Sequence, residues 1–234
     1  MGNNIAIIIP TYNAKNTIVE EINGIFKTLP DSKIFIVDDS SPDGTANLIR
    51  KFFAKDKRLE LIVRKQKAGR GTAVIKGFKT ALKNRNTGYF IEMDADLCHN
   101  PKYIPLLVSA CRKSDVAIAS KYLKTSRVIG LEAKRVIFSK FVNRYIKLML
   151  GVPISDYTNG FRCYKRKALE KIDLDSFTAG GFIMLSEIVY KMYKQGCTFS
   201  EIPFTMVFNG SNKSNFNLDE IGEAFLTILK LRFS

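Results

Sequence analysis

Short runs of apolar, mostly β-branched residues alternate along the chain with longer stretches in which apolar residues recur every three or four positions. The short runs predict buried strands at residues 5–9, 34–37, 59–63, 89–93 and 116–119. The longer stretches predict helices at residues 18–29, 46–53, 70–82 and 101–111. Strands that alternate with helices favour an α/β fold, with a mostly parallel sheet and helices on both of its faces.

The regular alternation stops at Lys121, where about a dozen polar and glycine-containing residues are typical of a functional loop. Beyond the loop, helices are expected at residues 133–150, after Gly181 and at residues 218–231, with short strands near Arg162 and at Ile202. A chain of 234 residues without a linker or an internal repeat predicts one domain spanning residues 1–234.

Carboxylates follow two of the predicted strands. Asp94 and Asp96 come directly after the fourth strand, and Asp39 follows the second, in front of a Ser-Pro-Asp-Gly turn. The carboxyl ends of parallel strands form the edge where open α/β sheets bind ligands. An isolated Asp-x-Asp arises often by chance, but two acidic strand ends together favour Mg²⁺ or Mn²⁺ held between protein and a diphosphate.

Other polar residues are weaker candidates. Arg70, between two glycines at a helix start, could bind phosphate, or the glycines could simply form a turn. Arg162 could be a phosphate ligand, with Asp156 as its partner or as a base. Glu187 has apolar neighbours, so it lies either on an exposed helix face or buried with a partner, and the second case would indicate function.

Charge is unevenly distributed in this chain, whose formal net charge is +15. Thirteen basic and three acidic residues lie between Lys121 and Lys171, and Lys140, Arg144 and Lys147 share one face of a predicted helix. Such a face fits nucleic acid, an anionic membrane surface or phosphorylated ligands. A solvated surface helix is an equal alternative. The basic region lacks a nucleic-acid recognition motif, which argues against nucleic acid.

Four cysteines without metal-ligand spacing indicate free thiols and a cytoplasmic location. No apolar run approaches the roughly 18 residues of a membrane-spanning helix, and no secretory signal precedes the strand at Ile5. We therefore expect a soluble protein, or one that lies peripherally on the cytoplasmic face of a membrane.

Several motifs together resemble the inverting family-2 glycosyltransferases of the GT-A fold, in particular the dolichyl-phosphate mannose synthases and related polyprenyl-phosphate sugar transferases. The motifs are Pro10-Thr11-Tyr12-Asn13, Val37-Asp38-Asp39-Ser40-Ser41-Pro42-Asp43-Gly44-Thr45, Gly69-Arg70-Gly71-Thr72-Ala73, Asp94-Ala95-Asp96-Leu97 with His99 and Pro101, Ala119-Ser120-Lys121-Tyr122, and the stretch from Ser155-Asp156 to Tyr164. Their order and spacing match over nearly the whole chain.

The resemblance implies a nucleotide-sugar donor, linked to GDP or UDP, and a polyprenyl or dolichyl phosphate acceptor. It implies roles for particular residues: Pro10, Tyr12, Val37 and Asp39 in a nucleoside pocket, Asp94-Ala95-Asp96 at the metal and diphosphate, and Lys121 as a catalytic phosphate contact. Residues 1–120 would bind the donor and residues 121–234 the acceptor. A membrane-anchored partner subunit is a further implied partner.

The chain departs from the family pattern at four positions. Ala14 replaces a glutamate, Cys98 replaces a glutamine, and an expected basic pair falls on Asn209 and Asn215, with Lys213 as the nearest basic substitute. The donor sugar and base therefore stay open.

Two transfer reactions fit these residues. A lipid phosphate acceptor is already an anion near neutral pH, so it needs no general base. A sugar hydroxyl acceptor on a glycan would need one, and Asp156 or Glu187 would be the candidates. The basic helix favours the phosphate acceptor.

Overall fold

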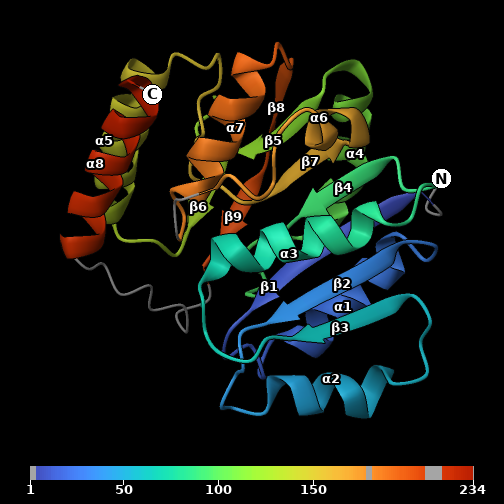
Figure 1. Cartoon of the computed structure of the whole chain (residues 1–234). Coiled ribbons are helices and arrows are strands. Elements are labelled where there is room, and N and C mark those ends of the chain that lie inside the picture. The colour runs from blue at the N-terminus through green and yellow to red at the C-terminus, as the bar shows by residue number, and fades with distance from the viewer. Residues whose placement is uncertain (1–3, 178–180, 209–217, 234) are drawn as a thin grey trace.

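The computed structural model describes residues 4–177, 181–208 and 218–233, which form one α/β assembly (Figure 1). Seven strands form the main sheet in the order β3-β2-β1-β4-β7-β5-β8. The strands are β1 (Ile5–Thr11), β2 (Lys33–Asp38), β3 (Leu59–Val63), β4 (Tyr89–Glu92), β5 (Val116–Ser120), β7 (Arg162–Lys165) and β8 (Phe199–Pro203). A second, two-stranded sheet pairs β6 (Arg127–Ile129) with β9 (Thr205–Val207) in parallel.

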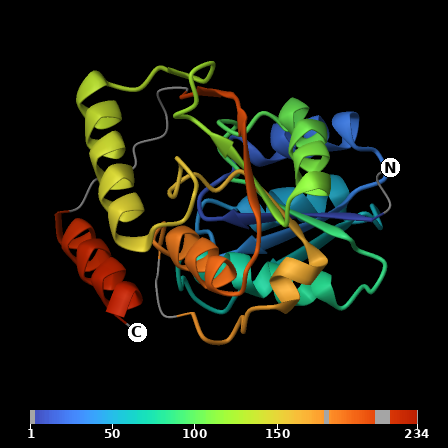
Figure 2. The ribbon, with the colours of Figure 1, turned by 90° about the horizontal axis from the view of Figure 1, so that it is seen from above.

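Helices cover both faces of the main sheet, as the alternating pattern predicts. They are α1 (Ile18–Thr28), α2 (Thr45–Phe53), α3 (Arg70–Leu82), α4 (Ile104–Lys113), α5 (Ala133–Leu150), α6 (Arg166–Glu170), α7 (Met184–Lys194) and α8 (Leu218–Phe233), with a 3-10 turn, η1 (Pro101–Tyr103), before α4. Figure 2 shows α1 and α4 on one side of the sheet and α3 and α7 on the other. The α5–α8 pair lies beyond the sheet, at the left of Figure 1.

Two hydrophobic cores follow from the alternation of side chains along the strands. Ile5, Ile7 and Ile9 of β1 face α1, α2 and α4, whereas Ala6 and Ile8 face α3 and α7. Helix α3 packs unusually close to β1 because it carries Gly77 at the contact, where a Cβ atom would lie 2.5 Å from Ile8 Cγ2. All five residues of this β1 run are buried, which is why the run is continuously apolar.

Parallel pairing brings the carboxyl ends of three strands together. In β1 and β2, Pro10 pairs with Val37 and Thr11 with Asp38, while Ile8 of β1 pairs with Glu92 of β4. The loops that follow β1, β2 and β4 therefore meet at one edge of the sheet.

Three local features differ from the expectations. Strand β7 runs antiparallel between β4 and β5, so the sheet is mixed at its centre. Part of the predicted loop after Lys121 forms β6. The expected helix at residue 101 begins as a 3-10 turn, capped by the Asn100 side chain, which accepts from the Lys102 amide at 3.0 Å. Among the described helices, none combines the length and apolar character needed to cross a bilayer.

Candidate active site

The loops after β1 and β2 are hydrogen-bonded to each other at the sheet edge. Thr11 Oγ1 donates to Asp38 Oδ1 at 2.8 Å, and the Asn13 amide donates to Ser41 Oγ at 3.0 Å. Tyr12 lies between these bonds with 43% of its surface exposed. The loops are thus held together while one aromatic ring stays accessible to a flat ligand such as a nucleobase.

Asp39 is buried, and its two oxygens bind the segment that follows β3. Oδ1 accepts from the Arg64 guanidinium, with which it forms an ion pair. Oδ2 accepts from the amides of Ala68 and Gly69, at 3.2 and 2.9 Å. These donors engage both oxygens, so the Asp39 carboxylate holds the segment after β3 in place.

The other predicted nucleoside contacts differ in their exposure. Lys67 Nζ lies 4.0 Å from the centroid of the Tyr12 ring, and Pro10 is half-buried in β1. Val37 is completely buried, and its Cγ2 lies 3.4 Å from the position that a Cβ atom would take on Gly77 of α3. The Val37 side chain therefore packs against a helix, and the expectation that Val37 lines the nucleoside pocket stays a prediction.

Asp94 is the centre of a charged network behind the loop that follows β4. Arg70 Nε donates to Asp94 Oδ1 at 2.8 Å, and Arg70 Nη1 donates to Oε1 of the buried Glu92 at 2.7 Å. Tyr164 Oη donates to the other Glu92 oxygen at 2.9 Å. Burial disfavours the Asp94 anion, but the charges of Arg70 and His99 and the hydrogen bonds from Arg70 outweigh it and lower the Asp94 pKa.

Side chains from the start of α1 hydrogen-bond to the backbone of the same loop. Thr17 Oγ1 donates to the Ala95 carbonyl at 2.5 Å, so Thr17, at the N-terminal end of α1, contacts the loop and makes no capping hydrogen bond to the helix. One turn later, Glu21 Oε2 accepts from the Leu97 amide at 3.1 Å. Leu97 has a φ of 65°, a conformation uncommon for residues other than glycine. Side chains of α1 thus stabilise a strained turn on which Asp96 is carried.

Glu21 is a second buried carboxyl beneath this loop. Its burial raises its pKa to about 8, the hydrogen bond from Leu97 opposes that change, and the nearby charges of Asp96, Asp94 and Glu20 raise the pKa further. Glu21 is thus protonated at neutral pH in the metal-free protein, which limits the negative charge that accumulates under the loop.

The loop after β4 supplies the donor set that a hard divalent cation prefers. Asp94 and Asp96 are oxygen donors, the lowered pKa keeps Asp94 ionised, and both side chains are partly exposed. Within the described ranges, no group of three His, Cys, Asp or Glu side chains could hold a metal by itself. The two aspartates therefore fit Mg²⁺ or Mn²⁺ that takes its other ligands from a diphosphate and water.

Lys121 and Asp156 form the second part of the site. Lys121 Nζ lies 3.1 Å from both Asp156 oxygens, and Asp156 is fully buried. The same carboxylate accepts from the amides of Lys121, Thr158 and Asn159, at 3.1, 3.2 and 3.0 Å. Asp156 therefore organises the 156–159 turn and positions the Lys121 ammonium group, and its oxygens are engaged rather than open to a proton.

Arg162 has no exposed surface, and its guanidinium donates to three backbone carbonyls, those of Asn159, Leu185 and Tyr157, at 2.7, 2.6 and 2.8 Å. The prediction of a phosphate ligand at Arg162 is therefore wrong for this structure. The residue joins the 157–159 turn to α7, because its five N–H groups suit several carbonyl acceptors at once.

Of the two environments expected for Glu187, the structure shows the buried one, in which the carboxylate has a partner. It is 1% exposed, and Lys191 Nζ lies 2.7 Å from its Oε1. Lys213 and the two departures at Asn209 and Asn215 lie outside the described residues. The structure thus brings Tyr12, Asp39, Arg70, Asp94 and Asp96 to one sheet edge, with Lys121 and Asp156 beyond β7.

Sequence reasoning missed Arg64, Glu92 and Glu21. Two of these had a local signal, since a carboxylate within an apolar stripe needs a buried partner. Glu92 ends an apolar strand, and Glu21 shares the stripe of Ile18 and Ile22 in α1. Arg64 had no such signal, because it follows a half-buried strand end as many surface arginines do.

This sheet, with two aspartates after β4 and an exposed tyrosine after β1, is that of a GT-A glycosyltransferase. The structure of glucosyl-3-phosphoglycerate synthase from Mycobacterium tuberculosis in complex with Mn²⁺ and UDP-glucose matches it with a TM-score of 0.70 and 16% identity, over 99% of this chain and 80% of that one. Residues 6–173 match the model of glycosyl transferase family 2, and the chain belongs to that family.

Two relatives are similar over almost the full chain. Polyprenol monophosphomannose synthase of Mycolicibacterium smegmatis is 33% identical over 224 residues, which are 95% of this chain and 84% of the relative. Undecaprenyl-phosphate mannosyltransferase of Micrococcus luteus is 30% identical over 223 residues, which are 95% of this chain and 91% of the relative.

Proposed function

We propose that this glycosyltransferase moves a sugar from a nucleotide-linked donor to a polyprenyl phosphate. The observation that supports this most directly is the similarity, along 95% of the chain, to two enzymes named for mannosyl transfer to polyprenyl phosphates. Mannose is accordingly the first sugar to test, on GDP or UDP. Residues 1–120 would bind the donor, since Tyr12, Asp94 and Asp96 lie there, and residues 121–234 would bind the acceptor.

Asp94 and Asp96 would hold Mg²⁺ or Mn²⁺ against the donor diphosphate. A divalent cation bound there offsets the negative charge that develops on the leaving diphosphate. Arg70 keeps Asp94 ionised and oriented, and Lys121 would add a cationic group on the acceptor side. Direct attack from the face opposite the diphosphate would invert the anomeric carbon.

A phosphate acceptor agrees with the state of the two candidate bases. Asp156 and Glu187 are at most 1% exposed, and each is paired with a lysine, at 3.1 and 2.7 Å. Neither is free to take a proton from a sugar hydroxyl, and a phosphate monoester, with a second pKa of about 6, does not require it. These contacts favour polyprenyl phosphate over a glycan hydroxyl.

The outer face of α5 supports a membrane-bound acceptor. Ile137, Phe141 and Leu148 are 68, 61 and 82% exposed, and their spacing puts them on one stripe of the helix. Helix α8 packs beside α5, with the rings of Tyr145 and Phe225 4.2 Å apart. Exposed apolar side chains beside lysines are typical of a helix that lies in a membrane interface.

Helix α8 extends this surface with Leu226 and Phe233, 60 and 82% exposed. We propose that α5 and α8 lie on the cytoplasmic face of a membrane, where a nucleotide sugar and a lipid phosphate would meet. A membrane-anchored partner subunit would use the same surface.

The test is a transfer assay with purified protein and detergent-dispersed undecaprenyl phosphate, with GDP-mannose, UDP-glucose and other nucleotide sugars as donors. We expect a lipid-linked sugar phosphate with at least one donor, formed with Mn²⁺ or Mg²⁺ and lost with a chelator. A glycan acceptor in parallel separates the two reactions. Transfer to the glycan alone would overturn the proposal.

A further inference from the structure

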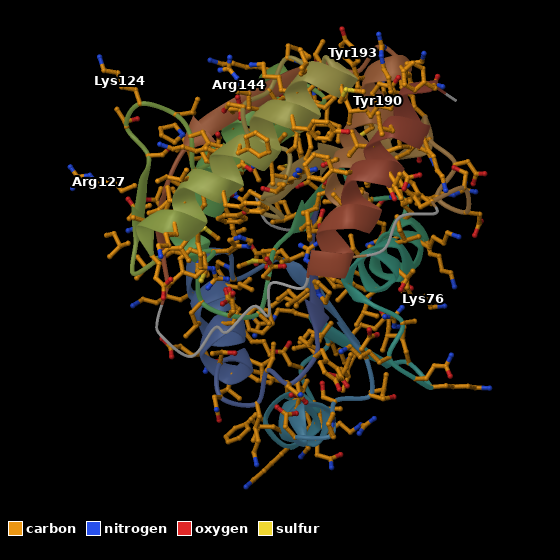
Figure 3. All side chains as sticks on the ribbon, turned by 90° about the vertical axis from the view of Figure 1, so that its left-hand side faces the viewer. Lys76, Lys124, Arg127, Arg144, Tyr190 and Tyr193 are labelled. Atoms are coloured by element: carbon orange, nitrogen blue, oxygen red, sulfur yellow. The ribbon has the colours of Figure 1, made fainter. Side chains whose placement is uncertain are left out.

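A cavity of about 360 Å³ lies beside α5, formed between that helix and the segments that follow β5 and precede β7. Its lining residues are Tyr122, Lys140, Asn143, Arg144, Lys147 and Ser155. The three cations are spaced i, i+4 and i+7, which places them on one helix face. Figure 3 shows Arg144 on the same side of the molecule as Lys124 and Arg127 of the segment after β5.

The wall of the cavity is held in place by the buried Asn143. Its Nδ2 donates to Tyr122 Oη and to Thr158 Oγ1, both at 3.1 Å, and its Oδ1 accepts from the Tyr157 amide at 2.7 Å. Ser155 Oγ, on the facing side, is bonded to Glu201 Oε1 at 2.7 Å. The cavity therefore has a fixed polar wall, with long cationic side chains at its rim.

The three cations have no counter-charge within the part of the chain that the structure describes. No salt bridge or side-chain hydrogen bond joins Lys140, Arg144 or Lys147 to another described residue. No carboxylate is among the described lining residues. The two carboxylates bonded to the segment that carries Ser155 are engaged: Glu201 accepts from Ser155 and from the Asp156 amide, and Asp156 pairs with Lys121. Like charges one turn apart repel each other, so a bound anion would stabilise this arrangement.

We propose that this cavity binds the phosphate group of a phosphomonoester or phosphodiester, in addition to any phosphate bound at the active site. Arg144 can bind two phosphate oxygens through its planar guanidinium, and the two lysines add point charges on either side. Two sources carry this chemistry, a soluble phosphate compound and the headgroup of an anionic lipid. The lipid source rests on the proposed membrane-bound function, whereas the phosphate site itself does not.

The test compares two variants with the same loss of charge. In the first, Lys140, Arg144 and Lys147 are replaced by Gln, which preserves helix propensity. In the second, the exposed Lys51, Lys55 and Lys57 of α2 and its following turn are replaced by Gln. Binding of inorganic phosphate is measured by calorimetry, and binding of phosphatidylcholine vesicles with and without phosphatidylglycerol by co-sedimentation.

We expect the cavity variant to bind at least one of these probes much more weakly, by roughly a hundredfold for phosphatidylglycerol vesicles, and the control variant to change little. Loss of phosphate binding alone identifies a soluble ligand, and loss of phosphatidylglycerol binding alone identifies a lipid headgroup. An equal loss of binding in both variants would show that only net charge matters, and it would overturn the proposed site. Unchanged binding of both probes by the cavity variant would also overturn it.

A third variant, Arg144→Lys, keeps the charge but removes the planar guanidinium. If the guanidinium binds phosphate, this variant should bind phosphate several-fold more weakly, whereas a merely basic surface predicts no change in affinity. Unchanged affinity would therefore contradict the role of Arg144. Phosphate binding requires no sugar transfer, so failure of the transfer assay would leave this result intact.

Discussion

Arg70 and Asp94 form an ion pair at the centre of the site, with Nε 2.8 Å and Nη2 2.7 Å from Asp94 Oδ1. The remaining nitrogen, Nη1, lies 2.7 Å from Glu92 Oε1. Gly160 leaves room for this arrangement, since a Cβ atom there would lie 2.1 Å from Arg70 Nη2. One cation thus neutralises both a buried carboxylate and one that faces the site.

Arg70→Met should therefore destabilise the fold as well as the site. Glu92 is completely buried, and removing its cation is expected to cost about 3–5 kcal/mol in the free energy of unfolding. Adding Glu92→Gln should recover much of that cost, because Gln still accepts from Tyr164. Urea unfolding of the metal-free single and double variants measures this, and equal stabilities would show that Glu92 does not depend on Arg70.

Asp96→Asn should remove metal binding and leave the fold intact. Asp96 is partly exposed, so losing its charge does not disturb the core. We expect weaker Mn²⁺ binding by electron paramagnetic resonance and transfer reduced by roughly a hundredfold or more. Asp31→Asn, on the exposed turn after α1, is the matched control. Normal Mn²⁺ affinity in Asp96→Asn would rule out Asp96 as a ligand.

Glu21 should make stability depend on pH. Its pKa of about 8 in the fold lies above the ordinary value of 4.5, so the folded chain keeps a proton that the unfolded chain loses. This stabilisation is greatest below pH 4.5 and is lost as the pH rises to 8, at no more than about 1.4 kcal/mol per pH unit.

Glu21→Gln removes that titration and keeps an acceptor for the Leu97 amide. In metal-free urea unfolding, the variant should gain stability relative to the native chain between pH 5 and pH 8.5, by at least about 1 kcal/mol. Parallel stability curves for the two proteins would contradict the raised pKa.

Arg162→Met should act on folding and not on acceptor affinity. Three buried carbonyl groups would lose their donor, at about 1–3 kcal/mol each before the turn relaxes. The melting temperature should fall by several degrees or more. A variant with native stability and a raised acceptor KM would instead restore Arg162 as a phosphate ligand.

The α5 stripe should bind membranes through its apolar residues, independently of charge. Phe141→Ser with Leu148→Ser removes two exposed side chains, each contributing about 1.5–3 kcal/mol if fully buried in lipid. Co-sedimentation with uncharged phosphatidylcholine vesicles should fall, while stability changes little. The control is Phe52→Ser with Val63→Ser, at 58 and 40% exposure on another part of the surface. Equal binding by both variants would place the membrane contact elsewhere.

The sequence by itself determined the alternating strands and helices and the position of Asp94 and Asp96. Both follow from local periodicity, since a buried parallel strand is continuously apolar and its carboxyl end reaches the ligand-binding edge whatever its neighbours are. The family motifs indicated the other candidate donor-binding residues, from Pro10 to Asp96, because each motif is a contiguous run. The packing of the Val37 side chain against α3 could not be read from its motif.

Only the tertiary structure decided which charges meet. Strand β7 enters antiparallel between β4 and β5, which pairs Phe90 with Tyr164 and Glu92 with Arg162 in the sheet. That single placement supplies Glu92 with the Tyr164 hydroxyl and buries Arg162 among carbonyls. No local pattern indicates it, because the residues paired between β4 and β7 are at least 70 residues apart in the sequence. The sequence around a charged residue does not reveal whether its side chain faces a ligand, water or a buried partner. Its burial and counter-charge are properties of packed neighbours, and these exist only once the chain has folded.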